Sequence, residues 1–230
     1  MALFAIGDPH LSLGSAKPMD VFGGAWENYV DKLREGFEVV QSEDTVILCG
    51  DLSWGMSLEE ALPDFQFLDA LPGTKYIVKG NHDYWWTTAN KMQTFWAEHG
   101  LETLHLLHNN CAFYGDVALC GTRGWFFDAQ QALAETDKVY RRELIRLECS
   151  LQAAGEAEEK LVFLHYPPKY QGYICQDIVD LLEKYRVSRC FYGHLHGPSH
   201  KLAIQGMAGG VDYRMVSADY LDFKPEKILD

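Results

Sequence analysis

Short apolar runs of strand length recur along the chain, and most of them end in a glycine or a polar residue. They occupy residues 2–7, 45–49, 74–79, 161–165 and 188–192. Runs of this length, rich in β-branched and aromatic residues, predict buried strands. Between them, helical spacing of apolar residues and helix-capping residues predict helices over about 26–40, 57–70, 87–99, 136–154 and 175–185.

The middle of the chain has a different pattern. Residues 111–114 and 117–121 are apolar runs separated by Gly115-Asp116, which predicts a β-hairpin. Residues 11–24 and 122–134 are expected to form loops, and residues 200–217 to form further strands. Strand–helix alternation at both ends, with a hairpin between, predicts an α/β fold of two packed sheets flanked by helices. We expect one domain over residues 1–230.

Composition narrows the range of partners. The hydrophobic share of 47% is that of a folded globular protein, and the net charge is −13. That charge argues against nonspecific electrostatic binding to long nucleic acid, although a short nucleotide substrate stays possible. No apolar run approaches the ~20 residues needed to span a bilayer, and no secretory pattern opens the chain. The six cysteines form no Cys-x-x-Cys pair, so we expect reduced thiols and a cytoplasmic protein.

The ends of five predicted strands carry the candidate chemistry. Their polar residues are Asp8 and His10, Asp51, the segment Gly80-Asn81-His82-Asp83, His165, and the pair His194 and His196. In open α/β sheets, ligands bind beyond the carboxyl ends of the strands. Imidazoles, carboxylates and amide oxygens are metal ligands, and imidazoles also carry protons. The five strand ends therefore predict one cleft that holds metal.

Other chemistries lack their motifs. The chain has neither the glycine-rich loop with Gly-Lys-Ser/Thr that cradles nucleotide phosphates nor the Gly-x-Ser-x-Gly elbow of serine hydrolases. A nucleophilic thiolate is disfavoured at Cys49, which lies inside a predicted buried strand.

The ordered motifs resemble those of the calcineurin-like metallophosphoesterases. The motifs are Asp8-x-His10, Gly50-Asp51, Gly80-Asn81-His82-Asp83, His165 and Gly193-His194-x-His196. The resemblance implies a four-layer α/β/β/α sandwich of two mixed sheets flanked by helices. It implies one metal ion held by Asp8, His10 and His196. It implies a second held by Asn81, His165 and His194, with Asp51 bridging the two.

Elementary metal chemistry agrees with that division. Two dications about 3.5–4 Å apart repel each other, and a shared carboxylate offsets the repulsion. The mixture of imidazole and oxygen ligands suits two divalent transition-metal ions, which would be Mn, Fe, Zn, Co or Ni.

The resemblance also implies a reaction. We expect hydrolysis of a small phosphomonoester or phosphodiester by metal-bound hydroxide, with His82 as the general acid. Asp83 would either orient His82 or cap the next helix. A cyclic-nucleotide phosphodiesterase or nuclease is the alternative within the enzymes. A catalytically silent metal-binding scaffold is the alternative from another class. The oligomeric state is not encoded in these patterns.

One departure from the family affects the substrate. Ser/Thr protein phosphatases of the family carry aspartate and arginine where this chain has Trp54 and Gly55, which argues against protein phosphatase activity. Arg123, flanked by glycines, is the candidate phosphate clamp, and a structural ion pair is its alternative. Nearby aromatic residues would line the cleft mouth or pack on the core; they are Trp125, Phe126 and Phe127. We expect Tyr84, Trp85 and Trp86 in the core.

Overall fold

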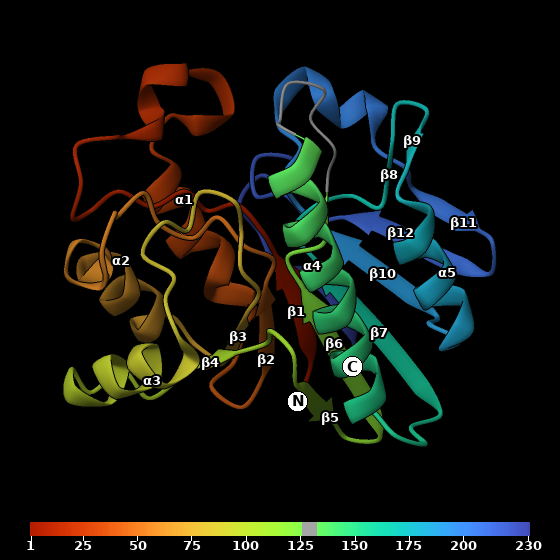
Figure 1. The fold of residues 1–230 in the computed structure, drawn as a ribbon. Helices are drawn as coiled ribbons and strands as arrows, with labels where there is room; N and C mark the ends of the chain where they lie inside the picture. The colour runs from red at the N-terminus through yellow and green to blue at the C-terminus, as the bar shows by residue number, and fades with distance from the viewer. Residues whose placement is uncertain (126–132) are drawn as a thin grey trace.

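Two mixed β-sheets form the centre of the protein in the computed structural model, which describes residues 1–125 and 133–230 (Figure 1). The first sheet has five strands, in the order β13 (Glu226–Leu229), β1 (Leu3–Ile6), β2 (Thr45–Leu48), β3 (Thr74–Ile77) and β4 (Leu104–Leu106). Strands β1 to β4 are parallel, and β13 is an antiparallel edge strand.

The second sheet has six strands. Their order is β11 (Gly206–Ala208), β12 (Val211–Met215), β10 (Arg189–Tyr192), β7 (Glu159–Leu164), β6 (Val117–Thr122) and β5 (Cys111–Tyr114). The four inner strands are parallel, and β11 and β5 are antiparallel edges. A small antiparallel pair consists of β8 (Lys169–Tyr170) and β9 (Tyr173–Ile174).

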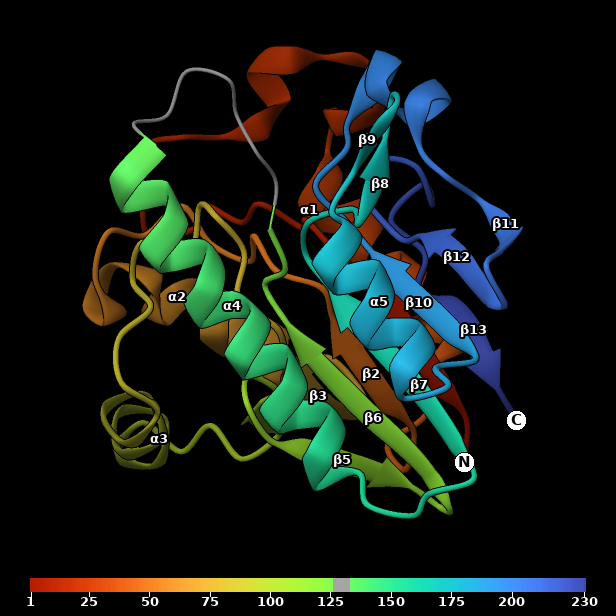
Figure 2. The ribbon, with the colours of Figure 1, turned by 45° about the vertical axis from the view of Figure 1, so that its right-hand side comes forward.

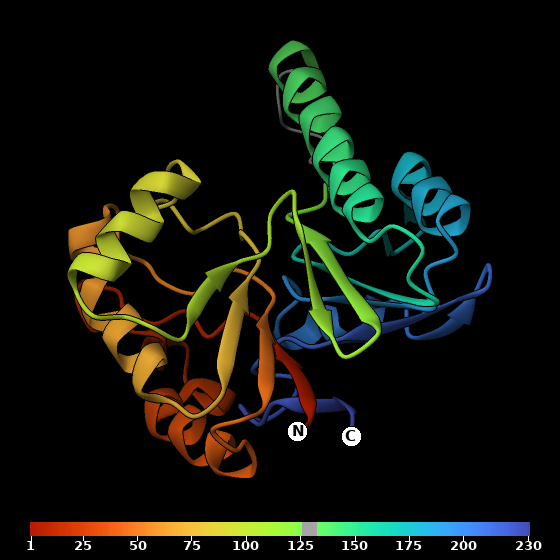
Figure 3. The same ribbon diagram turned by 90° about the horizontal axis from the view of Figure 1, so that it is seen from below.

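Helices cover the outer face of each sheet, which gives four layers (Figures 2 and 3). The first sheet carries α1 (Tyr29–Gly36), α2 (Leu58–Ala70) and α3 (Ala89–Glu98), and the second carries α4 (Leu133–Ala153) and α5 (Gln176–Lys184). The predicted start of α2 is confirmed, because the Ser57 hydroxyl accepts a hydrogen bond from the Glu60 amide at 3.2 Å. Short 3₁₀ turns are η1 (Met19–Phe22), η2 (Gly24–Trp26), η3 (Phe37–Val39) and η4 (Gly197–Leu202).

Apolar side chains fill all three spaces between these layers. Between the sheets, Ile47 packs with Phe163 and Phe191, whose rings stack at 5.1 Å. Two further clusters lie under the helices, with Phe65 and Trp96 in one and Leu147 and Leu182 in the other. The chain therefore buries both faces of each sheet, as its nearly continuous apolar strands require.

Strand register places the carboxyl ends of the parallel strands side by side. In the first sheet, Leu48 of β2 pairs with Ile6 of β1 and with Ile77 of β3. In the second, Tyr192 of β10 pairs with Leu164 of β7 and with Met215 of β12. The loops that leave these strands consequently begin at the same edge of each sheet.

The predicted fold class is confirmed, and several details differ. The helix expected over 26–40 is the shorter α1 between η2 and η3, and residues 197–202, partly expected as strand, form η4. Strands β4, β8, β9 and β13 were not predicted, because two- to four-residue strands carry too little periodicity. Among the described helices, none combines the length and apolarity needed to cross a membrane.

Candidate metal centre

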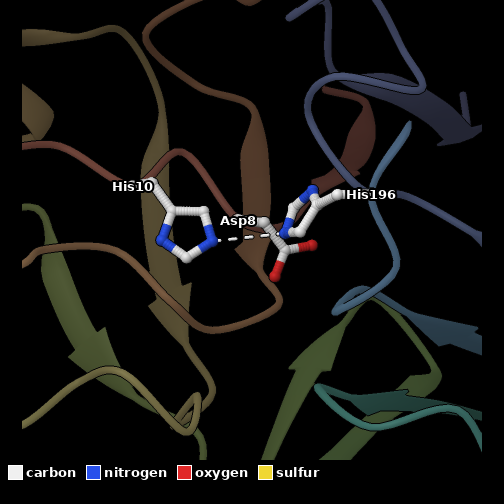
Figure 4. A group of neighbouring side chains, drawn as sticks. All are labelled: Asp8, His10 and His196. Atoms are coloured by element: carbon white, nitrogen blue, oxygen red, sulfur yellow. Dashed lines mark hydrogen bonds between the residues drawn. The ribbon is translucent and has the colours of Figure 1, made fainter. Parts of the chain in front are cut away.

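The first cluster of metal-ligating atoms joins the two sheets. Asp8 follows β1, His10 lies two residues further, and His196 follows β10. Figure 4 shows the three side chains pointing toward one another, with 3.2 Å between the Nε2 atoms of His10 and His196. One ligand atom from each residue lies within 4.8 Å of the others. The arrangement has the size of a cation site, although residues 186 positions apart build it.

A second cluster lies beside the first. Ligand atoms of Asp51, His165 and His194 also lie within 4.8 Å of one another, and His165 Nε2 is 2.6 Å from Asn81 Oδ1. Asp51 Oδ2 is 3.5 Å from His165 Nε2 and 3.7 Å from His10 Nε2. All seven predicted ligands therefore gather at one edge, with the Asp51 carboxylate between the two groups.

The donor atoms fit divalent cations. His196 Nδ1 lies 2.8 Å from Asp219 Oδ1, and His165 Nδ1 lies 3.1 Å from the Cys49 carbonyl, so each Nδ1–H donates outward. The Nε2 lone pairs of His196 and His165 then face the clusters, and that of His196 lies 3.2 Å from His10 Nε2, a separation that requires a cation or a proton between the two nitrogens. Asp8 Oδ1 is buried and has no hydrogen-bond partner among the described residues. A cation satisfies both the lone pairs and this oxygen.

Burial sets the electrostatics of the cluster. It raises the pKa of Asp8 to about 8 and that of Asp51 to about 6, because a desolvated carboxylate is costly. It lowers the pKa of His165 to about 3. By contrast, Asp219 raises the pKa of His196, although burial opposes protonation there. Divalent cations reverse this balance, since they favour both ionised carboxylates and neutral imidazoles.

The backbone at the site adopts an unusual conformation. Four predicted ligands have a positive φ: Asp8 (57°), His10 (45°), Asp51 (52°) and His194 (74°). Such angles cost free energy in residues with a side chain and cluster at functional sites. Gly193 approaches the Asp8 carboxylate so closely that an added Cβ would collide with it. The family-like glycine beside His194 is therefore a packing requirement of the cluster.

Asp83 connects two loops and does not cap the next helix, while its expected role in orienting His82 stays a prediction. Its buried carboxylate accepts backbone hydrogen bonds from Gly80 (2.7 Å), Asp51 (3.0 Å) and Leu52 (2.8 Å), and one from the Trp85 indole (3.1 Å). Helix α3 is capped by Thr88. The prediction that Asp83 caps the helix is wrong, and its contacts show it joining the loops after β2 and β3.

His82 lies next to the clusters on a partly exposed surface. Its ring is 5.8 Å from that of His10, and its Nδ1 is 3.2 Å from the Tyr84 hydroxyl. Trp54 packs 4.5 Å from the His82 ring and stacks on His10 at 5.1 Å. The tryptophan that replaces the protein phosphatases' aspartate thus contacts the candidate acid directly.

The structure shows the ion-pair alternative for Arg123. Its guanidinium Nη2 lies 3.3 Å from Glu143 Oε1 of α4. Trp125 is buried in the apolar cluster of the second sheet, as the core-packing alternative expects, while Phe126 and Phe127 lie outside the described residues. Trp85 is in the core as expected, but Tyr84 is exposed. Phosphate binding by Arg123 stays a prediction, and it would require the guanidinium to leave Glu143.

Sequence reasoning missed Asp219. It holds His196 by the Nδ1 contact, and its other oxygen accepts a hydrogen bond from the Gly197 amide at 3.0 Å. Carboxylates behind metal-binding histidines fix the ring and raise its basicity. Asp219 follows β12 by four residues, so the rule of polar residues after apolar strands would have found it.

The fold and the clusters indicate an α/β protein with a candidate site for divalent cations, and the family comparison gives the class of protein. The calcineurin-like phosphoesterase family model matches residues 1–198. The chain therefore belongs to this family and is a metal-dependent phosphoric ester hydrolase. A comparison with curated proteins gave no match.

Solved structures share the fold. Phosphopantetheinyl hydrolase from Mycobacterium tuberculosis is similar with a TM-score of 0.64 and 13% identity, covering 99% of this chain and 95% of that one. TT1561 from Thermus thermophilus is similar with a TM-score of 0.51 and 14% identity, covering 99% and 97%. At these identities, the likeness shows the architecture alone.

Proposed function

We propose that the protein hydrolyses a small phosphoester at a pair of divalent transition-metal ions. The observation that carries this proposal is the position of Asp51, whose Oδ2 lies within 3.7 Å of a histidine from each cluster. A carboxylate in that place offsets the repulsion of two cations.

The ligand side chains divide between the two ions. Asp8, His10 and His196 would hold one ion. Asn81, His165 and His194 would hold the other, with Asp51 shared. The ions, when bound, lower the pKa of water to near ~7 and offset the charge of the phosphoryl oxygens. The residues themselves keep the donor atoms buried and oriented before substrate arrives.

His82 supplies the proton for the leaving group. One O–H bond of water breaks and its proton passes to the solvent, the water oxygen forms a bond to phosphorus, the ester P–O bond breaks, and its electron pair goes to the leaving oxygen. That oxygen takes a proton from His82, whose ring Trp54 and the Tyr84 hydroxyl hold in place. A positioned general acid contributes roughly 10²–10⁴-fold to the rate.

The test is hydrolysis of p-nitrophenyl phosphate and bis-p-nitrophenyl phosphate with added Mn²⁺. Asp51→Asn should abolish turnover, and His82→Ala should lower kcat at least about 10²-fold with metal binding retained. His99→Ala is the matched control, because His99 is an exposed histidine at the end of α3. Full activity of His82→Ala would refute the acid assignment. Tight Mn²⁺ binding without turnover on either ester would indicate a silent scaffold.

A further inference from the structure

A cavity of about 450 Å³ opens directly beside the first cluster, with His196 in its wall. Its walls come from the η1–η2 segment and from the start of η4, which lie at the same end of the molecule (Figure 2). The walls include Met19, Phe22, Ala25, Trp26 and Pro198, together with the candidate ligand His196. Its volume falls in the range of small-molecule sites.

The chemistry of the walls selects an uncharged organic group. Of the described residues that line the cavity, only His196 and Asp219 are ionisable, and they already pair with each other at 2.8 Å. Both oxygens of Asp219 already accept hydrogen bonds, from His196 and from the Gly197 amide. A second phosphate or another charged group would find no partner there, whereas an alkyl or aryl group would bury apolar surface.

The described lining of the cavity includes Trp26 and His196 but neither the candidate acid His82 nor Trp54. The Trp26 ring contacts His196 at 5.5 Å and His10 at 5.8 Å. Trp54 contacts His10 and His82 instead. The leaving oxygen must lie beside His82 to receive its proton. A group seated against Trp26 is therefore the one that stays on phosphorus.

We infer that the cavity binds the retained organic substituent of a phosphodiester. The inference rests on the proposed function and specifies its substrate class. Water and the diester give a phosphomonoester, which keeps the substituent in the cavity, and an alcohol, which takes its proton from His82. The engagement of Arg123 by Glu143 agrees with this, since a diester brings one negative charge where a monoester brings up to two.

The test varies the retained group and keeps the leaving group constant. Phenyl p-nitrophenyl phosphate should react with a kcat/KM about 10-fold above that of methyl p-nitrophenyl phosphate, because the phenyl ring buries more apolar area. Phe22→Ser should lower that preference about 5-fold. Val21→Ser should keep it, since Val21 is the adjacent residue of η1 and does not line the cavity. Both side chains are more than 70% exposed, so neither change threatens folding.

A binding measurement accompanies the kinetics. Calorimetric titration of the Mn²⁺-loaded protein should show tighter binding of phenyl phosphate than of methyl phosphate, with the difference reduced in Phe22→Ser. Equal kcat/KM for the two diesters, or hydrolysis of p-nitrophenyl phosphate alone, would overturn the inference and leave the proposed function standing. Hydrolysis of none of the three esters would overturn the proposed function, and the inference with it.

Discussion

The two sheets contribute unlike halves to the metal centre. The first-sheet half, Asp8, His10, Asp51 and Asn81, has its three charged or ionisable side chains almost completely buried. The second-sheet half, His165, His194 and His196, is buried at His165 but open at His196, whose side chain is 30% exposed. On the proposed function, the first half would fix the geometry of the site, and the second half would also contact the substrate.

The contacts of the first-sheet half also differ from those of His196. Beyond β1 and β2, backbone hydrogen bonds continue to join the two segments. The amides of Asp8, His10 and Leu11 donate to the carbonyls of Gly50 (2.9 Å), Asp51 (3.0 Å) and Leu52 (2.9 Å). His196 instead depends on one side chain, Asp219, and lies at the wall of the cavity. Changes in the first half should therefore affect stability, and changes in the second should affect ligand affinity.

The largest expected effect comes from Asp83, which connects the loops of the first-sheet half. Asp83→Asn should lower the free energy of unfolding by about 3 kcal/mol. The asparagine NH₂ group replaces one accepting oxygen, and it cannot accept the hydrogen bonds of the backbone N–H groups that face it. Urea unfolding measures this, with the exposed hairpin residue Asp116→Asn as control. A loss of unfolding free energy equal to that of the control would mean that the backbone hydrogen bonds between these segments, not Asp83, hold the loops.

The next effect tests the second-sheet half at Asp219. Asp219→Asn should weaken metal binding about 10- to 100-fold, because His196 loses the anionic partner that orients it and raises its basicity. Calorimetric titration with Mn²⁺ gives the affinity, and thermal unfolding should change little. Asp222→Asn is the control, since this exposed residue has a φ of 50° that asparagine tolerates. Unchanged affinity would remove Asp219 from the site.

The ligands that directly follow parallel strands could be predicted from the sequence, whereas side-chain pairs between distant segments could not. Asp8, Asp51 and Asn81 follow apolar strands within a few residues, and parallel register then brings them together, so a local pattern and one topological rule suffice. The four-layer architecture follows from the family resemblance and from strands that are apolar on both faces.

Contacts between remote segments were beyond those rules. Trp26 meets the His196 ring from a segment 170 positions earlier, which no local periodicity encodes. Arg123 has the flanking glycines of a ligand-binding loop, yet its guanidinium forms an ion pair with Glu143 of α4. Pairing between distant side chains depends on how helices pack on sheets, and that was available only from the structure.

A smaller effect concerns the position of His82 between the halves. Trp54→Ala should lower kcat about 10-fold, because His82 loses the ring that supports it. Trp54→Phe should restore most of the rate, since the indole Nε1 finds no hydrogen-bond partner among the described residues. Metal affinity should stay the same in both variants. Equal kcat for alanine and phenylalanine would show that stacking does not position the acid.

The smallest effect lies at the opposite end of β3, away from the metal. Burial lowers the pKa of Lys75 to about 8, although its ammonium donates to the Asp69 carbonyl at 3.3 Å and the Thr103 hydroxyl at 3.1 Å. Between pH 8 and 10.5 the unfolded chain holds this proton and the folded chain does not. Stability therefore rises with pH there, by at most about 1.4 kcal/mol per pH unit.

Lys75→Met should remove that contribution and change stability at pH 7 by less than about 1 kcal/mol, because the lost hydrogen bonds are offset by the desolvation that methionine avoids. Urea unfolding from pH 7.5 to 9.5 compares the slopes, below the range where tyrosines ionise. Lys91→Met, at an exposed position of α3, should keep the slope of the unsubstituted protein. If the slope of stability against pH were the same in Lys75→Met as in the unsubstituted protein, the buried ammonium would stay charged over this range. This end of the first sheet would then tolerate a buried charge, whereas the edge with the metal ligands accepts one only with cations bound.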